Sequence, residues 1–313
     1  MGNVTDDTPA LDPRSTDWSR VTSIVCRVRQ HYRYTYTDAV WDLKQQLVMV
    51  PPDWHLDQRL LTYHLEVRGV DGDCSLTWEY DHFGNRIGRV VAARVPRAID
   101  LEAHYEVERR SAARGQRRSN LAALNSELAT YLELTALTAP DARLDAVARA
   151  LGENASDSRA LADRVHDWAA SAIGYQAGVT GVHTPAAMAL HLGSGVCQDY
   201  AHLMLCVLRL LGIPARYVSG HLLGEGAPHA WVEVLFEDAT SPGRLDVVGY
   251  DPSHHRRVGL GYITVAVGRD FADVTPTSGV FSGPGVGTLH WSKQAEIVEV
   301  DYGGGRTAVE IVG

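Results

Sequence analysis

The sequence predicts an α+β protein in which an antiparallel β region comes first and a helical region leads into a second antiparallel sheet. Three observations support this prediction. Residues 21–107 alternate apolar or aromatic with polar side chains, residues 120–173 carry apolar side chains three and four apart, and alternating segments return after Pro214. With 313 residues the chain is long enough for two domains, because single hydrophobic cores usually stop growing at about 250 residues.

The first β region holds four segments in which apolar or aromatic side chains alternate with polar ones. Turn sequences at 71–73 (DGD) and 83–85 (FGN) separate them. We expect these segments to pair as an antiparallel sheet or a sandwich. In chain order they are HYRYTYTDAV, LLTYHLEVRGV, CSLTWEYD and NRIGRVVAARV.

The helical region begins after the first β region. Segments 120–134 and 140–151 are rich in Ala, Leu and Glu, and 156–173 continues with apolar positions three and four apart. Thr184-Pro185 places a cap residue before a proline, which is the favoured order at the start of a short helix. We therefore expect four helices before the next motif.

A very apolar helix is predicted to run from Cys197 to Gly212. Its Leu, Met and Val side chains cover most of the circumference, so the helix belongs in the core. Strands return after Pro214 and complete the α+β order. They are ARYVSGHLL, HAWVEVLFE, RLDVVGYD and GYITVAVG.

Composition and charge exclude several kinds of partner. The net charge is −9 and the pI is near 5.8, so no broad basic face indicates nucleic acid or an anionic membrane as a partner. The one basic run, Arg109–Arg118, is short and is interpreted as a solvated linker. No stretch reaches the roughly 18 apolar residues that a membrane span needs, so the sequence predicts a soluble, cytoplasmic protein.

The four cysteines, Cys26, Cys74, Cys197 and Cys206, form no CxxC pair. Neither a disulfide framework nor a zinc knuckle is indicated, and reduced thiols fit the cytosol. A metal site built from Cys197, Cys206 and the histidines 202, 254 and 255 would lack ligand spacing on any one element. We therefore expect no metal and no cofactor.

Cys197 is the candidate nucleophile. It lies at the predicted N-terminus of a helix, where peptide dipoles favour a thiolate and free N–H groups could stabilise an oxyanion. The glycines at 193 and 195 are expected to remove bulk, so that a substrate can reach the sulfur. The alternative is that Cys197 is a small buried apolar residue, as Cys206 is expected to be. Cys206 comes nine residues later, on the opposite side of the helix, so only one of the two thiols can face a cleft.

His229 and Asp251 are the candidate partners of the thiol. His229 precedes an alternating run, and Asp251 ends the next strand. Taken alone, each has an ordinary explanation, as a surface histidine and as a turn residue. Neighbouring antiparallel strands can, however, place them side by side, so that the carboxylate accepts the ring N–H and orients the imidazole.

These residues lie within motifs that resemble the core of bacterial transglutaminase-like proteins. Further segments resemble the N-terminal β domain and the C-terminal signature of one bacterial branch, so the resemblance extends over residues 20–300. The core motifs are GVCQDYAH (195–202), LGIPARYVSG (211–220), HAWVEV (229–234) and Asp251-Pro252. The outer segments are YRY (32–34), DHFGNR (81–86), GRDFADV (268–274) and GVF (279–281).

The resemblance implies a papain-like α+β core with helices packed on an antiparallel sheet. It also implies a Cys-His-Asp catalytic site, carried here by Cys197, His229 and Asp251. We predict four parts along the chain. These are a flexible N-terminus (1–18), an N-terminal β-rich domain (19–110), a helical linker (111–140) and the transglutaminase-like catalytic core (141–313).

The chain departs from the family pattern beside the presumed cleft. Ser253-His254-His255 stands where a Thr followed by asparagines is expected, which puts the substrate preference in question. No motif places the aromatic residue that helps to bind the oxyanion in eukaryotic relatives. Tyr175 and Trp168 are candidates, although packing is the better explanation for each of them. Residues 220–228 hold three glycines and Glu225, and are predicted to form a mobile loop beside the cleft.

The predicted reaction is thiolate attack on a carbonyl, formation of a thioester acyl-enzyme and transfer of the acyl group to water or an amine. The partner is then a peptide or amide-containing substrate, joined by an amine acceptor if the enzyme forms amides. We favour hydrolysis, because the same triad serves either outcome and water is always available. A catalytically silent binding module is the remaining alternative. The oligomeric state does not follow from the sequence.

Overall fold

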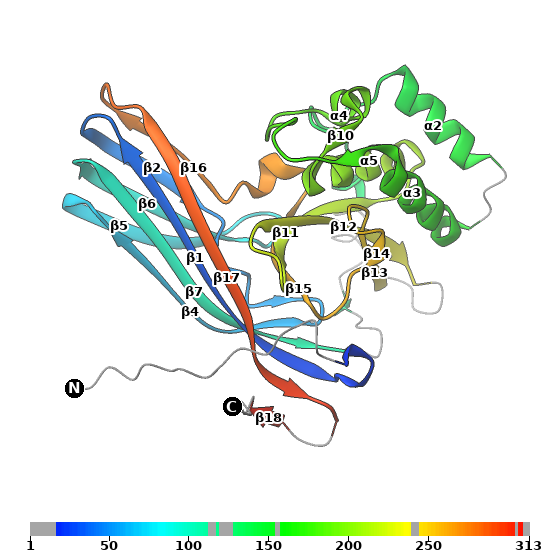
Figure 1. Cartoon of the computed structure of the whole chain (residues 1–313), viewed down its shortest axis with the longest axis horizontal. Helices are drawn as coiled ribbons and strands as arrows, with labels where there is room; N and C mark the ends of the chain where they lie inside the picture. Colours follow the sequence, from blue (N-terminus) through cyan, green and yellow to red (C-terminus); the bar gives the residue numbers. More distant parts are fainter. Residues whose placement is uncertain are drawn as a thin grey trace.

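The structure, a computed structural model, describes residues 17–111, 117–118, 128–153, 157–238, 244–303 and 306–308. Long antiparallel strands form one part, and helices on a second sheet form the other (Figure 1). This arrangement confirms the predicted α+β fold class. No helix among the described residues combines the length and apolar character that a membrane span requires. Most of the predicted flexible N-terminus and most of the helix expected at 120–134 lie outside these residues.

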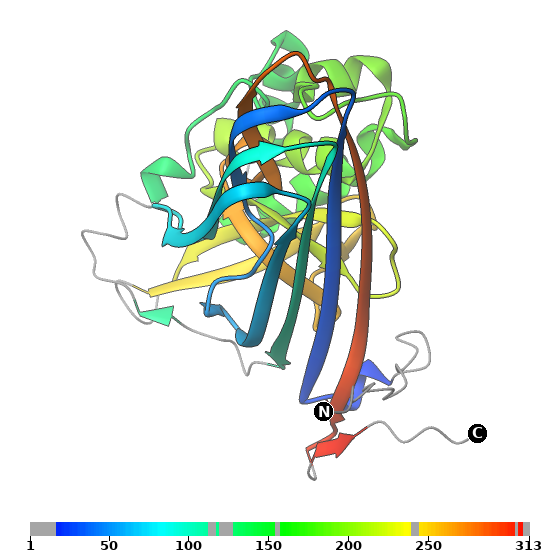
Figure 2. The ribbon, with the colours of Figure 1, turned by 90° about the vertical axis from the view of Figure 1, so that its left-hand side faces the viewer.

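The N-terminal strands form two facing antiparallel sheets, ordered β18-β17-β1-β7-β4-β3 and β16-β2-β6-β5. Alternate side chains from both sheets pack between them, as in a sandwich, with Leu43, Val90 and Leu101 fully buried. In Figure 2 these sheets face the viewer and the helical core lies behind them. The strands are β1 (Ser23–Tyr36), β2 (Val40–Leu47), β3 (Trp54–His55), β4 (Gln58–Arg68), β5 (Asp71–Tyr80), β6 (Arg86–Val95) and β7 (Ala98–Arg110).

Strands from the C-terminal end of the chain complete these sheets. β16 (Thr277–Ser282) pairs with β2, and β17 (Gly287–Asp301) runs antiparallel along the whole of β1. β18 (Arg306–Ala308) pairs with β17. The division of the chain at residue 141 stays a prediction, and the pairing of β16 and β17 crosses it. Alternation in the sequence indicates a strand but does not predict which other strand it pairs with.

The core sheet has the order β14-β13-β12-β11-β15, and its helices match the predicted segments within a few residues. The helices are α2 (Ala142–Gly152), α3 (Ser158–Ala172), α4 (Ala186–Leu192) and α5 (Cys197–Leu210). The strands are β11 (Ala215–Leu222), β12 (Pro228–Glu237), β13 (Arg244–Asp251), β14 (Arg256–Arg257) and β15 (Tyr262–Gly268). Short elements are η1 (Trp18–Arg20), β8 (Arg117–Arg118), β9 (Gly174–Tyr175), β10 (Ser194–Gly195) and η2 (Phe271–Val274).

Helix α5 is the centre of the core. It packs against β12, β11 and helices α2, α3 and α4, and every residue from Gln198 to Arg209 is buried. Each fully buried Leu or Met contributes about 1.5–3 kcal/mol relative to an exposed position. The expected core position of this helix is therefore confirmed, and its rigid packing holds its first residue, Cys197, in place.

Two buried amide side chains from the N-terminal part cap the free edge of the core sheet. Gln58 donates to the carbonyl of Thr264 at 2.7 Å and accepts from its N–H at 2.9 Å. Asn85 makes the same two bonds to Val267, at 2.7 and 2.8 Å. Each amide replaces a missing neighbouring strand, because it offers one donor and one acceptor. The two parts of the molecule are therefore joined along β15.

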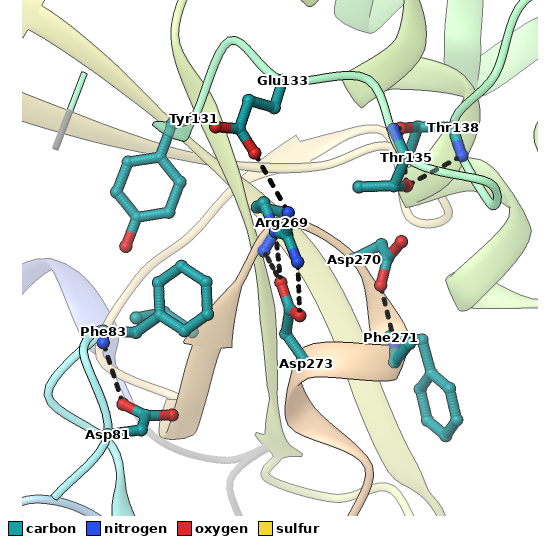
Figure 3. A network of polar contacts seen from close by, with 12 residues as sticks. Asp81, Phe83, Tyr131, Glu133, Thr135, Thr138, Arg269, Asp270, Phe271 and Asp273 are labelled. Carbon is teal, nitrogen blue, oxygen red and sulfur yellow. Dashed lines mark hydrogen bonds and ion pairs between the residues drawn. The ribbon is translucent and has the colours of Figure 1, made fainter. Parts of the chain in front are cut away.

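A second junction surrounds η2. Arg269 donates to Asp273 at 2.9 Å and to Glu133 at 3.0 Å, which ties η2 to the segment before α2 (Figure 3). The backbone N–H of Phe271 then donates to His202 on α5 at 3.2 Å. His202 is thus a buried, hydrogen-bonded core histidine. Burial lowers its pKa to about 3, so it stays neutral.

Candidate active site

Cys197 is the first residue of α5 and is partly exposed, whereas Cys206 on the same helix is completely buried. The buried Asp199 carboxylate caps the helix, since it accepts the N–H of Val196 at 2.7 Å and the hydroxyl of Thr180 at 2.6 Å. Burial raises the pKa of Asp199, against these two hydrogen bonds. Asp199 therefore fixes the backbone at the start of α5, and the Cys197 side chain lies at this N-terminal end of the helix.

Backbone geometry, rather than access for a substrate, accounts for the two glycines before Cys197. A Cβ at residue 195 would lie 2.5 Å from the Asp199 carboxylate, so this position admits only glycine while Asp199 caps the helix. Gly193 ends α4 in the left-handed conformation, with φ of 70°. Both glycines therefore serve the backbone around the site, and removal of bulk for a substrate is not needed to explain them.

His229 lies at the start of β12, where it pairs with Gly220 of β11. Its Nε2–H donates to Asp251 Oδ2 at 2.7 Å, and the Cys197 side chain lies beside the ring, close enough to affect its pKa. Because Nε2 faces the carboxylate, Nδ1 is the nitrogen left for the thiol. Burial alone would lower the pKa of His229, but the bonds to Asp251 and Cys197 raise it to about 9.

Asp251 ends β13 and is completely buried. Its Oδ2 accepts from His229, from the Tyr262 hydroxyl at 2.7 Å and from His254 Nδ1 at 2.9 Å. Its Oδ1 accepts the hydroxyl of Ser253 at 2.8 Å. Burial alone would raise the pKa of Asp251, but these hydrogen bonds hold it well below its usual range. The carboxylate is therefore ionised and immobilised.

His254 is the residue at this site that sequence reasoning underrated. Its ring lies 5.1 Å from the His229 ring, centroid to centroid, and its Nε2 lies 3.2 Å from a carboxylate oxygen of Glu225. The only signal in the sequence was the departure from the family pattern at this position. Tyr262 gave no signal, because its contact with Asp251 depends on how β13 and β15 are brought together.

The glycine-rich segment beside the site is shorter than expected. Gly220, His221 and Leu222 are buried in strand β11, and β12 begins at Pro228. The connecting turn is thus limited to residues 223–227. It carries Glu225 to the rim of the site, where this carboxylate contacts His254.

The two aromatic candidates have different positions. Tyr175 pairs with Gly195 in the short parallel ladder of β9 and β10, next to Cys197, and is 61% exposed. Its ring stacks on Tyr200 at 6.3 Å. Trp168 packs against the hydrophobic core from α3. Tyr175 therefore borders the site and Trp168 does not.

Among the described residues, two groups of His and Asp side chains bring their ligand atoms within 4.8 Å of one another. One group is His229, Asp251 and His254, and the other is His166, Asp167 and His255. Neither group contains Cys197, His202 or Cys206.

The helices packed on an antiparallel sheet give the core a papain-like fold, and this fold brings Cys197, His229 and Asp251 close together. Two family models match the chain: residues 26–108 match the bacterial transglutaminase-like N-terminal region, and residues 145–241 match the transglutaminase-like superfamily. The chain therefore carries a bacterial transglutaminase-like N-terminal region and a transglutaminase-like core, as its motifs predicted. The second match includes Cys197 and His229 and ends before Asp251. The match to this superfamily supports cysteine-based catalysis in general.

Curated relatives come from mycobacteria. An uncharacterized protein of Mycobacterium leprae (strain TN) is 40% identical over 168 residues, which are 50% of this chain and 57% of the relative. An uncharacterized protein of Mycobacterium tuberculosis (strain ATCC 25618 / H37Rv) is 38% identical over 117 residues, which are 34% of this chain and 37% of the relative. The similarity thus spans little more than half of the first relative and about a third of the second.

A solved structure has the same fold over nearly the whole chain. It is that of a "Putative Cysteine Protease" from Cytophaga hutchinsonii, with a TM-score of 0.70 and 19% sequence identity. The match covers 89% of this chain and 92% of the other. It confirms the predicted architecture of an N-terminal β region followed by a papain-like core.

Proposed function

We propose that this protein is a cysteine hydrolase of peptide or amide bonds, with Cys197 as nucleophile, His229 as base and Asp251 as the orienting group. The observation that carries the proposal is the buried His229–Asp251 pair, with the partly exposed thiol of Cys197 beside the His229 ring. The name of the Cytophaga hutchinsonii neighbour points in the same direction.

The first half of the reaction is acylation. The Cys197 thiolate attacks the carbonyl carbon, and the C–N bond breaks as protonated His229 gives its Nδ1 proton to the leaving amine. Asp251 holds the imidazole in position and stabilises its positive charge. The raised pKa of His229 favours the imidazolium form, which carries the proton that the leaving amine needs.

The oxyanion is stabilised at the N-terminal end of α5. The first N–H groups of a helix have no intrahelical acceptor and point along the helix dipole toward the site of the reacting carbonyl. Tyr175, exposed beside Gly195, is the side chain best placed to assist them. Loss of one such donor typically costs about 10²–10³ in rate.

The second half of the reaction is deacylation of the thioester. His229 removes a proton from water as the water attacks the acyl carbon, and the proton returns to the thiolate or to solvent as the acid leaves. Amide formation requires an amine to outcompete water in this step. The partly exposed thiol and the short turn at 223–227 leave the site open to water, which favours hydrolysis.

A direct assay separates these outcomes. The protein is incubated with a panel of fluorogenic peptide amides, with and without primary amines at saturating concentration, and the product masses are read. Mainly free acid, lost in Cys197→Ala and kept in Cys206→Ala, is the expected result. Capture of most of the acyl group by one simple amine would establish a transferase. Four equally slow thiols in an iodoacetamide labelling experiment, with no turnover, would indicate a silent binding module.

A further inference from the structure

A histidine–aspartate–histidine cluster lies outside the proposed triad, where α3 meets the turn after Asp251. His166 and Asp167 are adjacent on α3, and His255 lies between β13 and β14. His255 Nε2 is 2.8 Å from Asp167 Oδ1, and His166 Nδ1 is 3.9 Å from the same oxygen. The side chains of Asp167 and His255 are 68% and 61% exposed, so the cluster opens to solvent on one side.

The protonation of His166 follows from its hydrogen bond. Its Nε2 lies 3.2 Å from the backbone carbonyl oxygen of Asp251. A carbonyl oxygen only accepts, so Nε2 carries the hydrogen and Nδ1 keeps its lone pair, directed toward Asp167. Metal-binding histidines commonly show this arrangement, in which one nitrogen binds the ion and the other donates to a backbone carbonyl.

The spacing of the three ligand atoms suits a small divalent ion. Bonds of about 2.0–2.1 Å in a tetrahedron place neighbouring ligand atoms about 3.3 Å apart. The distances of 2.8 and 3.9 Å from Asp167 bracket this value, and all three atoms lie within 4.8 Å of one another. Small rotations of the exposed Asp167 and His255 side chains are enough to bring the ligand atoms to this tetrahedral spacing.

The charges around the cluster are compatible with a cation. Arg257 of β14 is a nearby positive group, and its guanidinium pairs with Asp163 and lies 3.7 Å over the Tyr250 ring. Its charge is therefore offset by another carboxylate. The other cluster, around His229 and His254, is less suitable, because both histidines already donate to the buried Asp251 carboxylate and an ion there would break those bonds.

We propose that His166 Nδ1, Asp167 and His255 Nε2 form a binding site for a divalent transition-metal ion of the Zn²⁺ type. Two imidazoles and one carboxylate are a ligand set that Zn²⁺ and Co²⁺ accept, and solvent completes the coordination. The ion takes the lone pair of His255 Nε2, so the single ring proton of neutral His255 lies on Nδ1 in the bound state. The bound ion links α3 to the turn that follows Asp251.

The test is calorimetric titration of Zn²⁺ into the untagged full chain carrying Cys197→Ala, which removes the thiol as a competing ligand. Co²⁺ titration followed by visible absorption gives the coordination in parallel. We expect one ion per chain. His255→Ala and Asp167→Asn, both at exposed positions, should weaken binding by at least about tenfold. His254→Ala, which alters only the other cluster, should change the affinity by less than about twofold.

Each alternative result contradicts the proposal. Undiminished binding in His255→Ala, or loss of binding in His254→Ala, would assign the ion to the cluster around His229. Absence of heat and of a Co²⁺ spectrum in the parent chain would show that the three side chains form only a hydrogen-bonded surface group. A circular dichroism melt of each variant confirms that the titrated protein is folded.

Discussion

Strand β12 contributes to two buried histidine–carboxylate pairs that differ in their third partner. His229 donates to Asp251 at 2.7 Å, and His55 of the N-terminal part donates to Glu233 at 3.0 Å. Both carboxylates are almost completely buried. The third partner of the first pair is the Cys197 thiol, which lies beside His229. The third partner of the second pair is Arg216, whose guanidinium lies 2.6 Å from the Glu233 carboxylate.

The difference shows that a buried histidine–carboxylate pair is not in itself a reactive site. Arg216 carries a permanent charge and no nucleophilic atom, so the cluster around Glu233 can only hold β3, β11 and β12 together. Burial alone would raise the pKa of Glu233, but His55 and Arg216 lower it to about 2. At the other pair the third partner is an ionisable thiol, which is why the proposed chemistry is assigned there.

The largest expected effect comes from the thiol. Cys197→Ala should lower kcat by at least about 10⁴-fold, because it removes the atom that forms the acyl-enzyme. The fold should remain, since the position is partly exposed. Cys206→Ala is the matched control, with near-parental kcat and a stability loss of about 1 kcal/mol from the small void. Turnover on fluorogenic peptide amides measures both, and retained activity in Cys197→Ala would end the triad hypothesis.

Asp251→Asn tests the carboxylate of the same pair. A neutral amide can no longer stabilise the imidazolium, so we expect kcat to fall by about 10⁴-fold while the thiol still reacts with iodoacetamide. Single-turnover kinetics and labelling rates give the two quantities separately. A loss of activity that merely follows a loss of folded protein in circular dichroism would reduce Asp251 to a structural role.

Glu233→Gln tests the other pair. The change removes the buried carboxylate that both Arg216 and His55 contact, which should lower the free energy of unfolding by about 3–5 kcal/mol. At a temperature where the variant stays folded, kcat should stay within about twofold of the parent, because Glu233 does not contact the thiol or His229. Urea unfolding and the turnover assay check this. A specific loss of kcat with unchanged stability would remove the distinction between the two pairs.

Gln58→Ala tests the junction along β15 between the N-terminal part and the core sheet. The buried N–H and carbonyl of Thr264 would lose their partners, at a cost of about 1–3 kcal/mol. The lower end is expected, because Thr264 and Asn85 border a cavity of about 590 Å³ through which water can reach the exposed backbone. Gln294→Ala, on the exposed part of β17, is the control and should stay within about 0.5 kcal/mol. Equal stability of the two variants would show that β15 needs no cap.

The contributions of the two pairs to stability should be lost at opposite ends of the pH range, and both should be largely retained near neutrality. The pKa of His229 is raised, so its contribution to stability is complete below about 6.5 and is lost as the pH rises through about 9. The pKa of Glu233 is lowered, so its contribution is complete above about 4.5 and is lost as the pH falls through about 2. Unfolding curves of the parent, His229→Ala and Glu233→Gln across this range check the signs. Curves that differ at the same end of the range would contradict the assignment.

Much of the protein could be predicted without a structure. The helix that begins at Cys197 follows from its apolar circumference, and the strand starting near His229 follows from its alternation. The candidate site residues follow from motifs that resemble one family, and the structure places them in contact. His254 could be noticed as a departure but not interpreted, because its hydrogen bond to Asp251 depends on the turn geometry between β13 and β14.

The contacts that could not be predicted are those between distant parts of the chain. Gln58 and Thr264 are separated by 206 residues, and His55 and Glu233 by 178. Local periodicity reports only on which face of its own element a residue occupies, so a buried glutamine or glutamate in a strand pattern looks like an ordinary polar residue. For the same reason, the sequence alone does not predict that β17 pairs with β1.

The sequence by itself determined the types of element, their order and which cysteine stands at the start of a buried helix, because these depend on propensity and periodicity over short windows. Tertiary structure alone decided which carboxylate serves which histidine. It also decided that one pair meets a thiol and the other a guanidinium. The reason is that a buried charge is stabilised only by partners brought to it through the packing of the sheets, and this packing depends on the whole chain.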